Sequence, residues 1–312
     1  MKVAIVGAGN VGRTIFHDLQ HLNMISEITL IGRNLKAIEA EVMDALDAAI
    51  LRNEYGPKLN YGSYEDVKDA DIIIYTAGTA KLKTDRMELL QENLMIAEEI
   101  FSIINQYNKE AIIICVSNPV DLITLKINKL TNRDPHKIIG TGTLLESARL
   151  IRFISELLEI SDRSINISVI GEHGNSAVAL LSSVRIMGLS LDDYLKTVTD
   201  NKGNLNIHKL QNAFKNKAYK IVNGKGYTST GVSAEICKII SAIGRDSREI
   251  LPVSSLLQGE YGIKDIAISV PSIIGKNGIE EIHEVMMTKE ENDAFMESVN
   301  KIKMIVKDNN LF

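Results

Sequence analysis

Residues 2–12 are Lys-Val-Ala-Ile-Val-Gly-Ala-Gly-Asn-Val-Gly, a short β-branched run followed by glycines spaced Gly-x-Gly-x-x-Gly. The run predicts a strand, and the amphipathic segment that continues to about Asn23 predicts a helix. Between a strand and a helix, the first glycine makes the turn, the second lets a pyrophosphate approach the backbone, and the third lets the helix pack on the strand. The helix N-terminus adds free N–H groups for the phosphates. This stretch therefore predicts a dinucleotide-binding unit, whose phosphate-binding residues are Gly7, Gly9, Asn10, Val11 and Gly12.

Strand-like and helix-like segments alternate beyond this motif. Continuous apolar runs such as Ile-Ile-Ile-Tyr and Ile-Ile-Ile-Cys suit strands covered on both faces, and such strands form parallel sheets flanked by helices. Strands joined by helical crossovers build a doubly wound Rossmann sheet, which is the α/β fold expected here. Further strands are expected at Glu27–Ile31, Asp71–Thr76, Ala111–Val116 and Lys137–Gly140, and long helices at Asn34 to about Asn53 and Met87–Tyr107.

The second half of the chain has a different pattern. Alternating segments at Ile165–Ile170 and Ile266–Ile273 lie between helical segments, which predicts a mixed α/β domain with antiparallel strands. We place the boundary near Thr143, which gives a dinucleotide-binding domain over residues 1–143 and a substrate domain over residues 144–312. The helices expected in the second half are Leu144–Leu158, His208–Val222, Gly231–Ile243 and about Lys289–Lys307.

Composition limits the class of protein. At roughly 150 residues per domain, 312 residues make about two domains, and 45% hydrophobic with 24% charged residues is ordinary globular composition. The 35 basic and 40 acidic residues include no basic run, so nucleic acid and anionic membranes are not expected partners. Cys115 and Cys237 are too few for a disulfide framework, and the six histidines are scattered, so no metal site is expected.

The N-terminus carries no signal-peptide pattern, because Gly7 interrupts the apolar run that follows Lys2. The longest purely apolar run, Ala111–Val116, is far shorter than a membrane span. We therefore expect a soluble, cytoplasmic protein.

The dinucleotide motif lacks its usual acidic partner. An aspartate or glutamate about 20 residues on holds the ribose hydroxyl of NAD, but counting from Gly12 leads to Gly32, followed by Arg33. A glycine leaves room for a 2′-phosphate, and Arg33 could pair with that phosphate. Alternatively, Gly32-Arg33 simply ends the strand and the ribose hydroxyl bonds to backbone. NAD is the expected cofactor, and we hypothesise that NADPH is at least tolerated.

Four further motifs occur together. They are Ser117-Asn-Pro-Val-Asp121, Gly140-Thr-Gly-Thr-Leu-Leu-Glu-Ser-Ala-Arg149, Gly171-Glu-His-Gly174 and Gly226-Tyr-Thr-Ser229. With these motifs the chain resembles the lactate/malate dehydrogenase superfamily over essentially its whole length, and most closely the L-2-hydroxyisocaproate branch, with L-lactate dehydrogenases close behind.

The resemblance implies a catalytic histidine at His173. Hydride transfer to a ketone leaves a developing alkoxide, and imidazole titrates near the pH at which it can supply the proton. An isolated histidine is more often structural, but Gly171 and Gly174 would let a substrate approach closely. The superfamily orients this histidine with an aspartate, and the matching residue here is Glu146, which keeps the charge but adds one methylene.

The resemblance also assigns substrate contacts. Arg149, three residues after Glu146 and on the same helix face, matches the arginine that grips the substrate carboxylate. Asn118 would bond to the substrate oxygen, with a cis bond expected before Pro119. Thr228 would line the pocket wall. The remaining cofactor-binding residues implied are Thr76, Ala77, Gly78, Val116 and Asn118.

The segment Thr79–Arg86 matches the mobile substrate loop, although it is shorter than the usual version and lacks its Pro-Gly or Gly-Glu elements. Arg86 matches the arginine that polarises the ketone once the loop excludes water. Lys81 matches the position where glutamine selects lactate and arginine selects malate. The pair Lys81-Leu82 resembles the hydroxyisocaproate branch, so we rank aliphatic 2-oxo acids above pyruvate, and oxaloacetate third.

The resemblance implies an NAD(P)-dependent L-2-hydroxy acid dehydrogenase that acts on a small 2-oxo acid and forms a homodimer or homotetramer. Two alternatives stay open. A malate dehydrogenase is supported only by the cation Lys81, which is a poorer carboxylate fork than arginine. A non-catalytic dinucleotide-binding sensor would keep the glycines and lose the chemistry, and it is supported only by Glu146 and the short loop.

Overall fold

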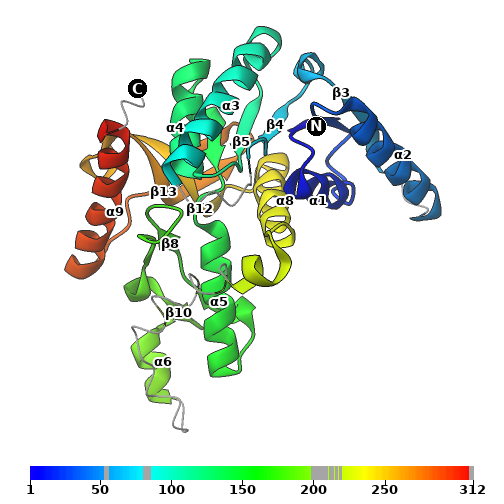
Figure 1. The fold of residues 1–312 in the computed structure, drawn as a ribbon. Helices are drawn as coiled ribbons and strands as arrows, with labels where there is room; N and C mark the ends of the chain where they lie inside the picture. The colour runs from blue at the N-terminus through cyan, green and yellow to red at the C-terminus, as the bar shows by residue number, and fades with distance from the viewer. Residues whose placement is uncertain are drawn as a thin grey trace.

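One large sheet organises the chain (Figure 1). The computed structural model describes residues 1–52, 56–79, 86–197, 210, 214, 217 and 220–308, and in them nine strands form this sheet in the order β14-β13-β12-β6-β5-β4-β1-β2-β3. Its strands are β1 (Lys2–Val6), β2 (Glu27–Ile31), β3 (Lys58–Gly62), β4 (Ile72–Tyr75), β5 (Ile112–Cys115), β6 (Ile138–Gly140), β12 (Glu249–Gln258), β13 (Lys264–Gly275) and β14 (Gly278–Ile282).

The first six strands are parallel and run in the order of a doubly wound sheet. In the middle of this half, Val6 at the end of β1 pairs with Ile31 of β2 on one side and with Tyr75 of β4 on the other. The strand order reverses between β1 and β4, so the carboxyl ends of these two strands open a crevice. The Rossmann architecture expected from the apolar runs is confirmed.

Helices cover both faces of the sheet because the strand side chains alternate. In β1, Val3 and Ile5 pack against α1, α2 and α8, whereas Ala4 and Val6 pack on the opposite side with α3, α4 and α9. The helices are α1 (Asn10–Leu19), α2 (Leu35–Arg52), α3 (Arg86–Tyr107), α4 (Val120–Thr131), α5 (Leu144–Leu158), α6 (Leu191–Thr197), α8 (Thr230–Arg245) and α9 (Lys289–Asp308). Short 3-10 turns are η1 (Tyr64–Val67), η2 (Pro135–Lys137), η3 (Asp162–Ser164), η4 (Leu181–Ser183) and η6 (Glu260–Gly262).

The antiparallel strands of the second half extend the parallel sheet. Ser254 of β12 pairs with Gly140 of β6, and β12 and β13 pair along most of their length. The expected strand Ile266–Ile273 is the centre of β13. The mixed fold of the second half is thus confirmed, but its longest strands lie in the same sheet as the dinucleotide motif.

A smaller lobe, which includes α5, projects from the large sheet (Figure 1). It has its own apolar core, which includes Leu150 and Ile154 of α5 and the buried Phe214. The expected strand Ile165–Ile170 is divided here between two sheets, because Ile165 pairs with β10 and Val169 with β9. The strands of the lobe are β7 (Ile165–Asn166), β8 (Val169–Ile170), β9 (Val178–Ala179), β10 (Arg185–Ile186) and β11 (Leu189–Ser190).

Three strands of the large sheet carry too weak a signal to be expected from sequence. Strand β3 is a short edge strand of polar alternation, β12 contains Pro252 and a pair of serines, and β14 follows a turn closely. The helix expected at His208–Val222 lies mostly outside the described residues, although residues 220–225 are helical. In the described part of the chain, no helix is both long and apolar enough to span a membrane.

Candidate active site

The glycine turn between β1 and α1 forms an open cradle. A Cβ at Gly12 would lie 1.8 Å from the carbonyl oxygen of Gly7, so only glycine allows the helix to pack this closely on the turn. At Gly9, by contrast, a Cβ would meet no atom within 4 Å. No side chain caps the first turn of α1, which begins at Asn10 and continues through Val11. Uncapped N–H groups beside open space fit the phosphates of a dinucleotide.

The ends of β4 and β5 lie beside this cradle. The Thr76 hydroxyl donates to the Gly7 carbonyl at 2.8 Å, and the Ser117 hydroxyl donates to the Ala77 carbonyl at 2.6 Å. The N–H of Val116 donates to the last carbonyl of β4 at 2.9 Å. The structure therefore brings the residues expected to bind the cofactor to one edge of the sheet, where the strand order reverses.

Asn93 of α3 connects the next residues of these two segments. Its Nδ2 donates to the Asn118 carbonyl at 2.8 Å, and its Oδ1 accepts from the N–H of Thr79 at 2.7 Å. A Cβ at Gly78 would lie 3.0 Å from the same Oδ1. The Asn118 side chain is exposed, and the bond to Pro119 is cis, as expected. Asn93 was not singled out from the sequence, because nothing local distinguishes a structural amide in a helix.

The end of β2 carries a cation and no carboxylate. Arg33 is exposed there, next to Gly32. A Cβ at Gly32 would lie 3.3 Å from the Cβ of Ala8 and 3.4 Å from Cγ2 of Ile38, so an acidic side chain would enter a tight space. The charged group available to a ribose or its phosphate at this point is thus the Arg33 guanidinium.

The turn that carries His173 is held by two other elements. Gly171 has a φ of +92°, and its N–H and carbonyl pair with the backbone of β13 at 2.9 and 3.2 Å. The N–H of Glu172 donates to the Ser298 hydroxyl of α9 at 2.7 Å, and its carboxylate pairs with Lys301 Nζ at 2.5 Å. These contacts from β13 and α9 fix the backbone directly before His173.

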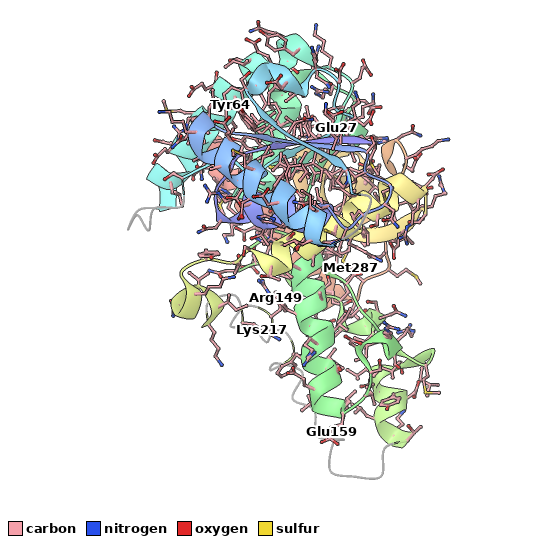
Figure 2. All side chains as sticks on the ribbon, turned by 90° about the vertical axis from the view of Figure 1, so that its right-hand side faces the viewer. Glu27, Tyr64, Arg149, Glu159, Lys217 and Met287 are labelled. Atoms are coloured by element: carbon pink, nitrogen blue, oxygen red, sulfur yellow. The ribbon has the colours of Figure 1, made fainter. Side chains whose placement is uncertain are left out.

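Glu146 lies between His173 and Arg149. Its Oε2 is 3.3 Å from Nδ1 of His173, and its Oε1 accepts a hydrogen bond from Nη1 of Arg149 at 3.1 Å. The side chains of Glu146 and Arg149 are each 10% exposed, and that of His173 is 25% exposed. Figure 2 shows Arg149 near the end of α5 that faces the large sheet, with Glu159 at the far end. Three residues expected in the chemistry are thus in direct contact.

The contact between Glu146 and His173 is an ion pair. Burial alone would lower the pKa of His173, but the charge of the Glu146 carboxylate raises it to about 10. Burial would raise the pKa of Glu146, yet the positive charges of His173 and Arg149 hold it below its usual value. His173 therefore keeps its proton at neutral pH. The atoms that face each other, Oε2 and Nδ1, do not form an aligned hydrogen bond here.

Asp121, the last residue of the 117–121 motif, contacts His173, and the sequence did not show this contact. Its Oδ2 accepts from the backbone N–H of His173 at 2.7 Å, and its Oδ1 accepts from the Ser254 hydroxyl at 2.6 Å. Burial raises the pKa of this carboxyl to about 6. The available signal was a lone acid in the apolar start of α4, directly after Val120.

The other expected substrate contacts are only partly described. Thr228 is half-buried in the turn before α8, and the structure describes no bond from it to His173. Arg86 is the first residue of α3, and its side chain is not among those described. Lys81 lies outside the described residues, as does most of the Thr79–Arg86 loop. Across the described side chains, no group of three His, Cys, Asp or Glu residues is arranged to hold a metal ion.

Comparison with known proteins shows the family of this chain. Residues 1–140 match the model of the lactate/malate dehydrogenase NAD binding domain, and residues 143–312 match that of the α/β C-terminal domain of the same family. The chain is 37% identical to an L-lactate dehydrogenase of Acetivibrio thermocellus, over 98% of this chain and 96% of that protein. It is 36% identical to an L-lactate dehydrogenase of Clostridium perfringens, over 97% and 95% of the two chains.

Solved structures give the same result. The minor L-lactate dehydrogenase of Enterococcus mundtii, in a ligand-bound form, superposes with a TM-score of 0.91 at 32% identity, over 98% of both chains. A lactate dehydrogenase from a deep-sea metagenome of the Medee basin superposes with a TM-score of 0.93 at 26% identity, also over 98% of both chains. The family resemblance of the sequence motifs is confirmed, with NAD as the cofactor. This chain belongs to the lactate/malate dehydrogenase family.

Proposed function

We propose that this chain is an L-2-hydroxy acid dehydrogenase that interconverts a small 2-oxo acid and its L-2-hydroxy acid. The observation that supports it best is the contact of a protonated His173 with Glu146, which in turn bonds to Arg149. A proton donor and a carboxylate-binding cation thus share one buried counter-ion. In this proposal residues 1–143 bind the cofactor and residues 144–312 supply most of the substrate site.

His173 is the proton donor in this reaction. A reduced nicotinamide, once bound, would supply the hydride for the carbonyl carbon, and the carbonyl oxygen would then need a proton. The imidazolium of His173 gives that proton, and Glu146 stabilises the cation before transfer. In the reverse direction, neutral His173 accepts the hydroxyl proton. The bond from the backbone N–H of His173 to Asp121 holds the backbone at this position in both directions.

Arg149 binds the substrate carboxylate. Only Nη1 of its guanidinium is engaged by Glu146, and the other N–H groups are available for a planar carboxylate. We assign Asn118 to the substrate oxygen, Arg86 to polarisation of the ketone, and Thr228 to the wall beside the substrate side chain. Lys81 selects the substrate, and we rank aliphatic 2-oxo acids such as 2-oxoisocaproate above pyruvate.

The test is a matrix of two cofactors and three substrates. NADH and NADPH are each offered with pyruvate, 2-oxoisocaproate and oxaloacetate, and the loss of reduced-nicotinamide absorbance is followed. Turnover with the aliphatic acids is the expected result. Turnover with oxaloacetate alone would assign the chain to malate and make Lys81 a carboxylate reader. No turnover with any pair, in a protein that still binds the cofactor, would identify a sensor.

We predict that Arg33 determines how well the protein uses NADPH. In Arg33→Ser, kcat/KM for NADPH falls about tenfold or more, because a charge-assisted bond to the 2′-phosphate is lost. The kcat/KM for NADH stays within about twofold of the wild-type value. The matched control is Arg163→Ser, which removes an exposed arginine from η3, far along the chain from the cradle. An unchanged ratio of NADPH to NADH turnover in Arg33→Ser would show that the ribose is held by backbone alone.

We further propose that the chain forms a homo-oligomer through α2. Met43, Leu46 and Ile50 lie on one side of this helix and are 61%, 45% and 78% exposed. Such a stripe is typical of a covered helix face. Light scattering is expected to give a multiple of 34.5 kDa, and Met43→Lys combined with Ile50→Lys is expected to reduce it. A wild-type mass of one chain would rule the assembly out.

A further inference from the structure

Glu235 is a buried acid that none of the assigned roles uses. It lies on the face of α8 that packs into the core, next to Ile236 and one turn before Ile239, and it is 6% exposed. A carboxyl group is costly in such a place unless it has partners. Its position on an otherwise apolar helix face therefore requires an explanation.

The partner of Glu235 is the first turn of α5. Its Oε1 accepts from the N–H of Leu145 at 3.2 Å, which is one of the N–H groups that a helix leaves free at its N-terminus. The two helices are also packed tightly there, because a Cβ at Gly231 of α8 would lie 3.1 Å from the Leu145 side chain. Glu235 thus holds the residue that directly precedes Glu146.

Glu235 also belongs to the charge cluster of the site. The ionisable groups that face it are Glu146 and Arg149 from α5 and His173 from the turn after β8. On the other side of α8, Asp18 of α1 faces Cys237 instead. His173 itself faces Asp121 of α4 in addition to the two glutamates. A charge on Glu235 would therefore act on His173 directly.

We propose that Glu235 is a positioning residue of the proton-transfer site, which holds the first turn of α5 so that Glu146 meets His173 and adjusts how firmly His173 keeps its proton. The inference rests on the proposed role of His173 as proton donor. Burial and the neighbouring charge of Glu146 raise the pKa of Glu235 well above its usual range. When this carboxyl is ionised, its negative charge opposes the loss of the His173 proton.

The test is the titration of His173 in the ligand-free protein. The imidazole carbon resonances are followed by NMR, and the His173 signal is the one absent from His173→Asn. Glu235→Gln keeps an oxygen that accepts from Leu145 but has no charge. Its His173 midpoint is expected to move to lower pH by on the order of one unit, as for loss of a charge at close range in a protein. A midpoint equal to that of the wild type would overturn the proposal.

Two further variants control for nonspecific effects of removing a buried glutamate and for misfolding. Glu291→Gln is the matched control, because Glu291 is a buried glutamate that bonds to Ser182, far from His173, and its removal should leave the midpoint in place. A shift as large in Glu291→Gln as in Glu235→Gln would also overturn the proposal. If Glu235→Gln does not fold, Glu235→Met places an apolar chain of similar length in the apolar face and is expected to shift the midpoint in the same direction.

Turnover measured on the same proteins distinguishes a failure of the proposed dehydrogenase function from a failure of the proposed role of Glu235. Glu235→Met should lower kcat more than Glu235→Gln does, because only glutamine keeps an acceptor for the Leu145 N–H in the first turn of α5. If the wild type reduces no 2-oxo acid, the proposed function fails whatever the NMR shows. If the wild type is active and neither Glu235 variant moves the midpoint, only the inference about Glu235 fails.

Discussion

His173→Asn is expected to lower kcat for 2-oxo acid reduction by about 10³-fold, within the range for loss of a general acid, while NADH binds as in the wild type. Asparagine has a similar polar shape but no proton that titrates near neutral pH. The backbone N–H at this position still bonds to Asp121, so the turn should stay in place. Steady-state rates and the fluorescence of bound NADH measure the two effects separately.

The chain provides a matched control for this variant. His17 of α1 pairs with Glu41 at 2.8 Å, so His17→Asn removes another histidine–glutamate pair of the same chemistry. Its kcat should stay near the wild-type value. If His173→Asn keeps the wild-type turnover, His173 is not the proton donor. If neither substitution changes turnover in a protein that binds NADH, the result favours the non-catalytic sensor.

Glu146→Gln is expected to lower the pH at which reduction stops. Reduction needs the imidazolium, and burial would lower the pKa of His173 once the carboxylate is gone. The wild-type rate should therefore hold until the pH approaches about 10, whereas the variant should lose rate from below pH 6.5 upward. At pH 8 the expected loss in kcat/KM is about 100-fold, since each unit of pKa is a factor of ten.

The free energy of unfolding depends on the same titration of His173. The pKa of His173 is higher in the folded chain than in the unfolded one, so the ion pair contributes its full stability below about pH 6.5 and loses it as the pH rises through about 10. Chemical unfolding of Glu146→Gln should lack this alkaline decline. Glu146→Asp keeps the charge and should keep the alkaline limit within about one unit. A profile in Glu146→Gln that overlays the wild type would show that another group protonates the substrate.

Much of the fold could be predicted because the parallel strands are covered on both faces. Runs such as Ile112–Cys115 are continuously apolar for that reason, and the glycine pattern fixes where the first strand turns into a helix. The edge strand β3 needs no such run, since one of its sides faces solvent, and its Lys58-Leu-Asn-Tyr-Gly62 segment gave no strand prediction.

The candidate site could be predicted only as far as its single residues. The motifs predict His173, Glu146 and Arg149 individually, and helix spacing places the last two on one face. The contact of the Glu146 carboxylate with both His173 and Arg149 depends on how α5 and the 171–174 turn approach each other, which the sequence does not give. The contacts of Glu235 and Asp121 could not be predicted for the same reason, because each bonds to a segment distant in sequence.

The pairing of β6 with β12 has a consequence for how members of this family can exchange parts. Asp121, from the cofactor half, positions His173 and takes a hydrogen bond from Ser254, which lies on β12 in the other half. A chimera cut near Thr143 would join a foreign β12 to this β6 and would have to supply a serine at the same register. Exchange of the cofactor half would therefore also replace the acceptor of the His173 N–H, whereas a substitution at Arg33 leaves Asp121 and Ser254 as they are.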